Sequence, residues 1–276
     1  MPKFDANLTM LFGEVDFLDR FEAAAMAGFA GVEYLFPYAY KKEQLVEKLR
    51  KNGLVQVLHN LPAGNWDKGE RGIGCLPDRV NEFQQGVGKA IAYATALGCQ
   101  QVNCLMGLAP ESVSPLQLHD TVVSNVSFAA VELKKAGIRL LIEPCNTRDM
   151  PGFYLNRTAQ ALEIIKDAAS DNVFVQYDVY HAQVMEGDLA NTIEKNLVHI
   201  GHIQVADNPG RHEPGTGEIN YPYLFALLDR IGYSGWVGCE YKPAAKTEQG
   251  LGWRTALVRK VNSAKSRGRS RSVAER

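Results

Sequence analysis

The sequence predicts an α/β fold of the closed (β/α)8 type, a TIM barrel, in a single domain. Short apolar runs alternate with longer amphipathic segments along most of the chain, and this strand–helix alternation is typical of a parallel sheet. Eight such units within about 240 residues favour a closed barrel over an open sheet. An open doubly wound sheet is the alternative, but the sequence contains no GxGxxG or Walker A glycine loop that would support it.

The eight apolar runs are predicted to be strands because each is short and lies between longer segments with a helical pattern. In chain order they are residues 4–8, 31–35, 55–59, 101–105, 139–143, 173–178, 200–205 and 236–240. The segments between them repeat apolar residues at every third or fourth position, which predicts helices over residues 17–27, 42–52, 80–97, 114–136, 158–169, 188–196 and 221–231. Five of these segments are followed by a glycine expected to cap the helix: Gly28, Gly53, Gly98, Gly137 and Gly232.

The composition changes near Trp253. We therefore assign residues 1–253 to the barrel domain and residues 254–276 to a basic tail rich in arginine and serine. This tail has few large apolar residues, so we predict that it is disordered. A role for it in binding anions or nucleic acid is the alternative.

The bulk properties exclude several classes of protein. The 276 residues carry a formal net charge of -1, which gives no indication of a nucleic-acid or membrane partner. No apolar run reaches the roughly 18 residues of a membrane span. The first residues include Asp5 and Asn7 where a signal peptide has its apolar run, so a cytoplasmic location is expected. The five cysteines are scattered, without CxxC spacing, and are expected in the core.

Four predicted strands end in a side chain that binds hard cations: Glu143, Asp178, Gln204 and Glu240. Active sites of (β/α)8 barrels lie at the carboxyl ends of the strands. Burying such carboxylates without a cation is costly, and oxygen ligands suit Mg2+ or Mn2+ better than zinc. For any one of these residues a polar, loop-facing position is the alternative. His202 alternates with Gln204 and is expected on the same face of its strand.

Longer motifs show a family resemblance. They include His59-Asn60-Leu61-Pro62-Ala63-Gly64, Gly69-Glu70-Arg71-Gly72, Ile142-Glu143-Pro144, Tyr177-Asp178-Val179-Tyr180-His181, His202-Ile203-Gln204-Val205-Ala206-Asp207 and Gly238-Cys239-Glu240-Tyr241-Lys242-Pro243. Over about residues 2–253 the chain resembles the hydroxypyruvate isomerase family of the xylose isomerase-like TIM barrels.

The resemblance implies an isomerase that interconverts hydroxypyruvate and tartronate semialdehyde, a small hydroxy-keto acid pair, through an enediolate. It implies that Glu143, Asp178, Gln204 and Glu240 bind the divalent metal and that Glu143 and Glu240 also transfer protons. By the same resemblance, His181 contacts a substrate oxygen, and Arg211 binds substrate less securely because its loop varies in length. A homodimer is possible by family analogy.

The resemblance also implies that His59, Glu70 and Arg71 line the pocket. Arg71 is our best candidate for binding the substrate carboxylate, because arginine binds carboxylates with two parallel hydrogen bonds, and Lys242 is the alternative anchor. Pairing of Arg71 with a nearby acid, a structural role for His59 and a solvated Lys242 remain open. The glycine-rich segment 62–79 is expected to form a lid over the site.

Four other functions remain as alternatives. A 2-oxo-tetronate isomerase would use the same metal and glutamates. A ketose 3-epimerase is less favoured, because the fourth ligand there is usually histidine and here it is Gln204. A DNA-repair endonuclease would need several histidine ligands and a basic surface, which six histidines and a net charge of -1 do not favour. A metal-dependent sugar-acid sensor would not need the two glutamates.

Overall fold

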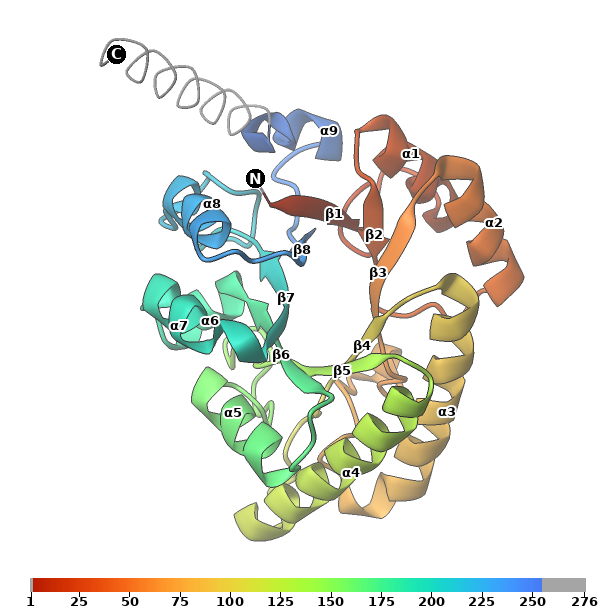
Figure 1. The fold of residues 1–276 in the computed structure, drawn as a ribbon, viewed down its shortest axis with the longest axis vertical. Coiled ribbons are helices and arrows are strands. Elements are labelled where there is room, and N and C mark those ends of the chain that lie inside the picture. The colour runs from red at the N-terminus through yellow and green to blue at the C-terminus, as the bar shows by residue number, and fades with distance from the viewer. Residues whose placement is uncertain (1, 255–276) are drawn as a thin grey trace, which may run out of the picture.

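The computed structural model of the protein describes residues 2–254, and in it eight parallel strands form a closed barrel in sequence order (Figure 1). The strands are β1 (Lys3–Asn7), β2 (Gly31–Glu33), β3 (Val55–Asn60), β4 (Gln101–Cys104), β5 (Arg139–Ile142), β6 (Val173–Asp178), β7 (Ile200–Val205) and β8 (Trp236–Cys239). Pairing of β1 with β8 closes the ring. The predicted fold class is confirmed.

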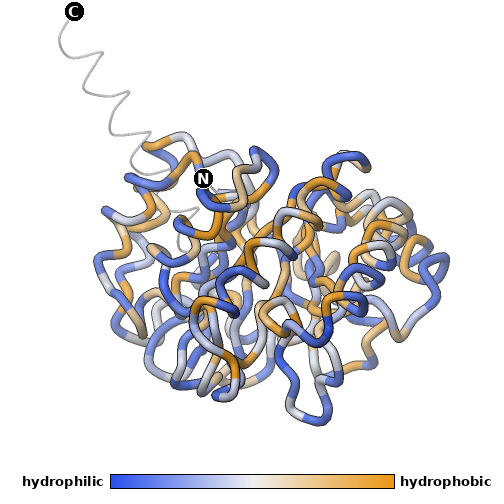
Figure 2. The backbone as a smooth tube through the Cα atoms, turned by 90° about the horizontal axis from the view of Figure 1, so that it is seen from below, coloured by the Kyte–Doolittle hydropathy of each residue, from blue (hydrophilic) through white to orange (hydrophobic). Residues whose placement is uncertain are grey.

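The helices form a ring outside the strands (Figure 1). They are α1 (Arg20–Met26), α2 (Lys42–Asn52), α3 (Val80–Leu97), α4 (Pro115–Lys135), α5 (Thr158–Asp167), α6 (Val179–Met185), α7 (Leu189–Asn196), α8 (Tyr221–Arg230) and α9 (Thr247–Gly250), with short 3-10 turns at Phe17–Asp19, Trp66–Lys68, Pro77–Arg79 and Leu197–His199. Figure 2 shows hydrophobic and hydrophilic segments alternating along them, as expected for helices that pack on a barrel with one face. The five predicted cap glycines all have positive φ, which confirms the caps.

Helix α6 was not predicted. It begins directly after β6, because the side chain of Asp178 caps its first turn by accepting hydrogen bonds from the backbone N–H groups of Tyr180 and His181 at 2.7 and 3.2 Å. Its seven residues are too few to show a clear helical period. The cap places His181 one turn away from the carboxylate that ends β6.

The lower part of the barrel interior contains a small group of apolar side chains from four strands. Leu58 on β3, Leu141 on β5, Phe174 on β6 and Trp236 on β8 pack together with Val57. Side chains directly above them are polar, as the next sections describe. Apolar side chains therefore occupy the amino end of the barrel interior, and the polar side chains that could take part in a reaction lie toward the carboxyl end.

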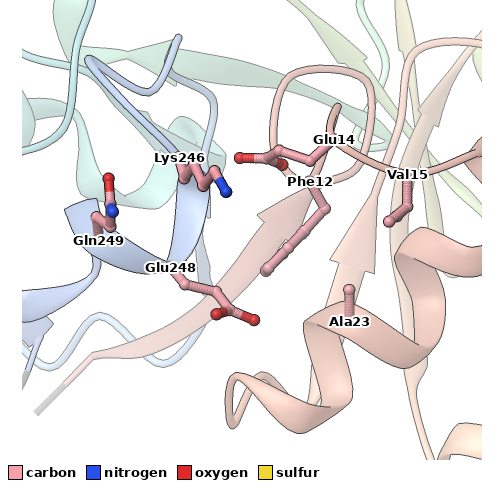
Figure 3. Close-up of a pocket in the computed structure, with 7 residues that line it drawn as sticks. All are labelled: Phe12, Glu14, Val15, Ala23, Lys246, Glu248 and Gln249. Atoms are coloured by element: carbon pink, nitrogen blue, oxygen red, sulfur yellow. The ribbon is translucent and has the colours of Figure 1, made fainter.

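The first and last units of the barrel are joined by side-chain hydrogen bonds. Thr247 on α9 donates its backbone N–H to Glu14 in the loop after β1, and its hydroxyl accepts the N–H of Phe12 at 2.7 Å. A cavity of about 280 Å3 lies beside this junction, with Phe12, Val15 and Ala23 on its apolar side and Glu14, Lys246, Glu248 and Gln249 around it (Figure 3). None of these residues is in the candidate site described below.

The predicted lid segment is tied to its neighbours in this structure. Gly72 forms an isolated antiparallel bridge with Met106, in the loop after β4, and the N–H of Gly72 donates to the carbonyl of Ala63. Whether the segment opens and closes stays a prediction. Of the helices in residues 2–254, none combines the length and the apolar character that crossing a bilayer requires. The predicted tail lies outside the described residues, apart from Arg254.

Candidate active site

Three buried carboxylates meet at the carboxyl-end mouth of the barrel. Glu143 follows β5, Asp178 ends β6 and Glu240 follows β8, and one oxygen of each lies within 4.8 Å of the others. Their exposed fractions are 5%, 2% and 5%. We refer to Glu143, Asp178 and Glu240 as the mouth cluster. The sequence predicted these residues as a converging set, and the closed sheet brings them together.

The two oxygens of Asp178 have different environments. Oδ1 accepts the two backbone hydrogen bonds that cap α6, whereas Oδ2 is buried without a hydrogen-bond partner. Oδ2 lies 3.6 Å from Nη2 of Arg211. One oxygen therefore fixes the carboxylate, and the other is left to bind something that the protein side chains do not supply.

The electrostatics of the mouth cluster favour a cation. Burial raises the pKa of Glu143 to about 8, helped by the charge of Asp178 and opposed by Arg211. Burial also raises the pKa of Glu240 well above its ordinary value, with Arg211 opposing the shift and Glu143 adding to it. Three closely spaced buried carboxylates stay ionised only when positive charge is brought to them. Oxygen donors of this kind fit Mg2+ or Mn2+.

Gln204, the fourth predicted ligand, lies beside Asp178. The two residues are partners in the β6–β7 register, so their side chains are on the same face of the sheet. The side-chain nitrogen of Gln204 donates to Oε1 of Glu33 at 2.7 Å, and its oxygen accepts from Gln176 at 2.6 Å. An amide oxygen has two lone pairs, so Gln204 keeps one for a metal. Its role as a ligand stays a prediction.

His181 joins the mouth cluster as a neutral donor. Its Nε2 lies 3.9 Å from Glu143 and 3.8 Å from Asp178, and burial lowers the pKa of the imidazole to about 4. Its Nδ1 accepts the backbone N–H of Asn146 at 3.2 Å, so the proton of the neutral ring is on Nε2. The ring therefore presents an N–H group to the space between the carboxylates.

Arg211 also reaches the mouth cluster. Its guanidinium lies 3.2 Å from Oε1 of Glu240 and 5.2 Å from the ring of Tyr180, and the side chain is buried. Its backbone has a φ of 57°, an uncommon value for a residue with a side chain, and its carbonyl accepts the N–H of Lys242 at 2.7 Å. The loop after β7 thus holds a positive charge at the site.

The other predicted pocket residues are placed differently. Arg71 stacks on Trp66, with its guanidinium 4.3 Å from the ring, and donates to the carbonyls of Trp66 and Glu70. Glu70 is held by the backbone of Asn65 and by Arg79 at 2.6 Å, so it fastens the lid segment. Lys242 is exposed.

His59 does not lie with the other predicted site residues. In the β3–β4 register it pairs with Val102, whereas Asn60 pairs with Asn103, whose amide reaches Glu143. His59 therefore lies on the opposite face of β3, where it packs against Tyr38. This placement gives no support to a contact between His59 and substrate, and Asn60 holds the inward position.

Several polar residues of the barrel interior were missed by sequence reasoning. Asn103 donates to Oε2 of Glu143 at 2.8 Å and to Asn60 at 3.2 Å. Below them, Glu33 accepts from Asn7 at 3.0 Å and lies 2.7 Å from His202. Polar residues two positions apart within apolar runs share one face of a strand, and this signal could have found Asn7, which follows Asp5, and Asn103, which follows Gln101. Glu33 and Asn60 have no such partner in their runs.

Asp5, Glu33 and His202 form a second group of buried ionisable residues, which we call the core cluster. Glu33 and His202 come from β2 and β7, which are not neighbours, so their contact crosses the barrel interior. Burial would raise the pKa of Glu33, but the interaction with His202 and the hydrogen bonds from Gln204 and Asn7 outweigh it and lower the pKa. Burial and the charge of Glu33 raise the pKa of Asp5 well above its ordinary value.

Comparison with known proteins gives close relatives. The family model described as xylose isomerase-like TIM barrel matches residues 21–257. The chain is 56% identical to the hydroxypyruvate isomerase of Escherichia coli K12 over 92% of this chain and 98% of the relative, and 47% identical to the 2-oxo-tetronate isomerase of Cupriavidus necator over 92% and 97%.

Solved structures agree with the fold. A crystal structure described as an AP endonuclease, family 2, from Brucella melitensis is 46% identical, with a TM-score of 0.91 over 93% of this chain and 99% of that chain. An L-ribulose 3-epimerase structure, 24% identical with a TM-score of 0.73 over 93% of this chain and 86% of that chain, shows the shared fold alone.

Proposed function

The chain belongs to the xylose isomerase-like TIM barrel family, and from that premise we propose that it is a hydroxypyruvate isomerase, which interconverts hydroxypyruvate and tartronate semialdehyde. The observation that carries this proposal is the mouth cluster in a chain 56% identical to the Escherichia coli hydroxypyruvate isomerase. Two of its three carboxylates are glutamates from β5 and β8, so they reach the mouth from different parts of the barrel.

The reaction requires two proton transfers between carbon and protein. A proton leaves C3 of hydroxypyruvate and a proton arrives at C2, while the hydroxyl proton moves from the C3 oxygen to the C2 oxygen. We assign the two carbon protons to Glu143 and Glu240, with Glu240 as the first base. General acid–base catalysis by positioned carboxylates contributes about 10²- to 10⁴-fold to such rates.

Glu143, Asp178, Gln204 and Glu240 would hold a divalent metal, and the unpartnered Oδ2 of Asp178 supports this fit. When bound there, Mg2+ or Mn2+ supplies Lewis-acid stabilisation of the negative charge that develops on the substrate oxygens. A glutamate that both binds the metal and transfers a proton must keep a lone pair available for the proton. Asn103 donates to Oε2 of Glu143 at 2.8 Å, and that oxygen retains a second lone pair.

The remaining polar groups orient the substrate. His181 would donate its Nε2 proton to a substrate oxygen, because its Nδ1 is already engaged by Asn146. Arg211 and Arg71 are the candidates for the substrate carboxylate. Arg211 is at the mouth cluster, whereas Arg71 is on the lid segment and would have to leave the carbonyls it now contacts. A cytoplasmic location and a homodimer stay predictions from the sequence.

The 2-oxo-tetronate isomerase is the second candidate, because relatives with that name are 47% identical over most of the chain. It would use the same residues on a substrate one carbon longer. The Brucella relative's name raises endonuclease activity, but within residues 2–254 no candidate metal group holds more than one histidine. A multi-zinc nuclease centre rich in histidine is therefore not supported by this site.

The experiment measures isomerisation of hydroxypyruvate and of 2-oxo-tetronate by EDTA-stripped protein before and after Mg2+ or Mn2+ is added. Glu143→Gln and Glu240→Gln are compared with wild type, and Glu213→Gln serves as a buried glutamate control from outside the mouth cluster. Metal-dependent turnover of hydroxypyruvate that both site variants abolish supports the proposal. Preference for 2-oxo-tetronate changes the substrate, and full activity without metal or without either glutamate overturns the mechanism.

A further inference from the structure

The barrel interior contains one arrangement that catalysis as proposed above does not use. The carboxylate of Glu33 crosses from β2 to β7, and it accepts from the side chain of Gln204 at 2.7 Å and of Asn7 at 3.0 Å. Glu33 is 1% exposed, and its charge raises the pKa of Glu143 and Glu240 in the mouth cluster, but among residues 2–254 no hydrogen bond or ion pair joins it to them. The contacts of Glu33 therefore lie one layer below the proposed metal site, and Gln204 lies between Glu33 and that site.

The orientation of the Gln204 amide can be settled from this network. Oδ1 of Asn7 accepts the backbone N–H of Thr9 at 3.0 Å, so the other end of the Asn7 side chain is its NH2 group. That NH2 donates to Oε1 of Glu33, which makes Oε1 an acceptor. Gln204 must then also present its NH2 group to the same oxygen. Its carbonyl oxygen consequently points away from Glu33 and accepts from the side chain of Gln176, which is two residues before Asp178 on the same face of β6.

A glycine on β8, which is two strands away from β2 in the closed sheet, leaves room for this carboxylate. A Cβ added to Gly238 on β8 would lie 2.6 Å from Oε1 and 2.7 Å from Oε2 of Glu33. In the register Gly238 pairs with both Gln204 and Asp5, so the missing side chain faces the interior beside the amide that Glu33 holds. The glycine has no positive φ that would otherwise explain it.

We infer that Glu33 is a positioning residue, which holds the side-chain amide of Gln204 so that its oxygen is presented to the metal at the barrel mouth. This inference rests on the proposed function, since it takes Gln204 as a ligand. Partners that orient metal ligands typically contribute about 10- to 100-fold to metal affinity. What Glu33 supplies to Gln204 is a hydrogen-bond acceptor at Oε1.

The test measures Mn2+ affinity of the EDTA-stripped full chain, by electron paramagnetic resonance of free Mn2+, so that it does not depend on turnover. Glu33→Leu removes the acceptor, and we expect Mn2+ to bind about 10- to 100-fold more weakly. Glu33→Gln is the matched control. Its side-chain oxygen can take the position of Oε1, and its NH2 group can face Nε2 of His202. His202 would then carry its proton on Nδ1, and this buried atom has no hydrogen-bond partner that would oppose the change of tautomer. We expect this variant to bind within about threefold of wild type, as expected when the acceptor is retained.

A double-mutant cycle separates positioning from general damage. In a Gln204→Ala background the Glu33→Leu substitution should have no further effect on Mn2+ affinity, because the residue through which Glu33 acts is gone. Gly238→Ala provides a second route if Glu33→Leu does not fold. The added methyl group pushes the carboxylate of Glu33. Gly238→Ala should therefore weaken Mn2+ binding when Gln204 is present but not in the Gln204→Ala background.

The outcomes are distinct. Weakening by Glu33→Leu or Gly238→Ala that disappears in the Gln204→Ala background, with Glu33→Gln near wild type, supports the inference. The positioning role is overturned if Gln204→Ala weakens Mn2+ binding but neither Glu33→Leu nor Gly238→Ala does. It is also overturned if the effects of Glu33→Leu and Gly238→Ala are equally large in the Gln204→Ala background. In both cases the metal site stands. Mn2+ affinity unchanged by Gln204→Ala removes Gln204 from the site, and then both the ligand assignment and the inference fail.

Discussion

The mouth cluster and the core cluster lie in the same barrel and are equally buried, yet their hydrogen bonding differs. In the core cluster both oxygens of Glu33 have partners, from Asn7 and Gln204 on one and His202 on the other. In the mouth cluster Oδ2 of Asp178 has no hydrogen-bond partner. Buried carboxylates need partners, so Glu33, whose partners come from the protein, belongs to the scaffold, whereas Asp178 keeps one oxygen for a ligand. Asp5 of the core cluster also lacks hydrogen-bond partners on both oxygens, but burial and the charge of Glu33 raise its pKa well above its ordinary value, which favours the uncharged carboxyl group.

This difference predicts opposite costs for substitutions in the two clusters. Removing a mouth carboxylate should cost activity while sparing stability, because the cluster is strained by repulsion among its members. Removing a partner in the core cluster should cost stability, because it leaves a buried charge uncompensated.

The largest effect is expected for Glu240→Gln. We expect kcat/KM for hydroxypyruvate to fall by about 10²- to 10⁴-fold, the usual contribution of a general acid–base residue. The stability of the metal-free protein in urea should be unchanged or higher, because burial already raises the pKa of Glu240 well above its ordinary value. Activity and urea midpoints of the two proteins check this. A variant that loses stability and activity together would assign the mouth cluster to the scaffold.

His202→Leu should have the converse effect. It leaves Oε2 of the buried Glu33 without its hydrogen-bond partner, and an unsatisfied buried polar group costs about 1–3 kcal/mol, or more when it is charged. Urea unfolding of the metal-free protein measures the loss. His202→Gln, which keeps a donor near Oε2 of Glu33, is the matched control and should recover part of the stability. Equal stability of wild type and the leucine variant would contradict the scaffold role.

Metal should stabilise the protein through the mouth cluster alone. At a free Mn2+ concentration 100 times Kd, ligand binding to the folded state adds about 2.7 kcal/mol. We expect this increment in wild type and in His202→Gln, but not in Asp178→Asn. The asparagine still caps α6 through its side-chain oxygen, so its loss of the increment would reflect metal binding. The measurement is the urea midpoint with and without Mn2+, and an increment retained by Asp178→Asn would place the cation elsewhere.

The smallest effect is expected at Glu70, outside both clusters. The hydrogen bond from Asn65 and the interaction with Arg79 lower its pKa. Stability that depends on its charge is therefore present above the unfolded-state pKa of about 4.3 and is lost as the pH falls through the lower folded-state pKa. Its side chain is 36% exposed, so Glu70→Gln should cost less than about 1 kcal/mol near pH 7. The thermal midpoints of wild type and Glu70→Gln, measured from pH 7 to pH 3, should converge at the acidic end. A difference between them that widens there would contradict the assignment.

Much of the architecture could be predicted from local pattern. Helices α2 and α3 have the predicted bounds, and the glycines after them adopt the predicted left-handed conformation. The mouth carboxylates were found because an acidic residue at the end of an apolar strand conflicts with burial, and this conflict is visible in a single sequence. Helix α6 was missed, since its start depends on one side-chain cap and its length is only seven residues.

The sequence by itself determined the strands, the helices between them and the acidic residues at the strand ends, because these depend on periodicity and on the cost of burying charge. Only the tertiary structure decided which side chains face the barrel interior. The β2–β3 register shifts between Val32 and Glu33, and Asn60, not His59, lies on the inner face. A shift of one residue exchanges the two faces of a strand, and such a shift leaves no trace in local composition. The contact of Glu33 with Gln204 likewise exists only because the closed sheet brings β2 opposite β7.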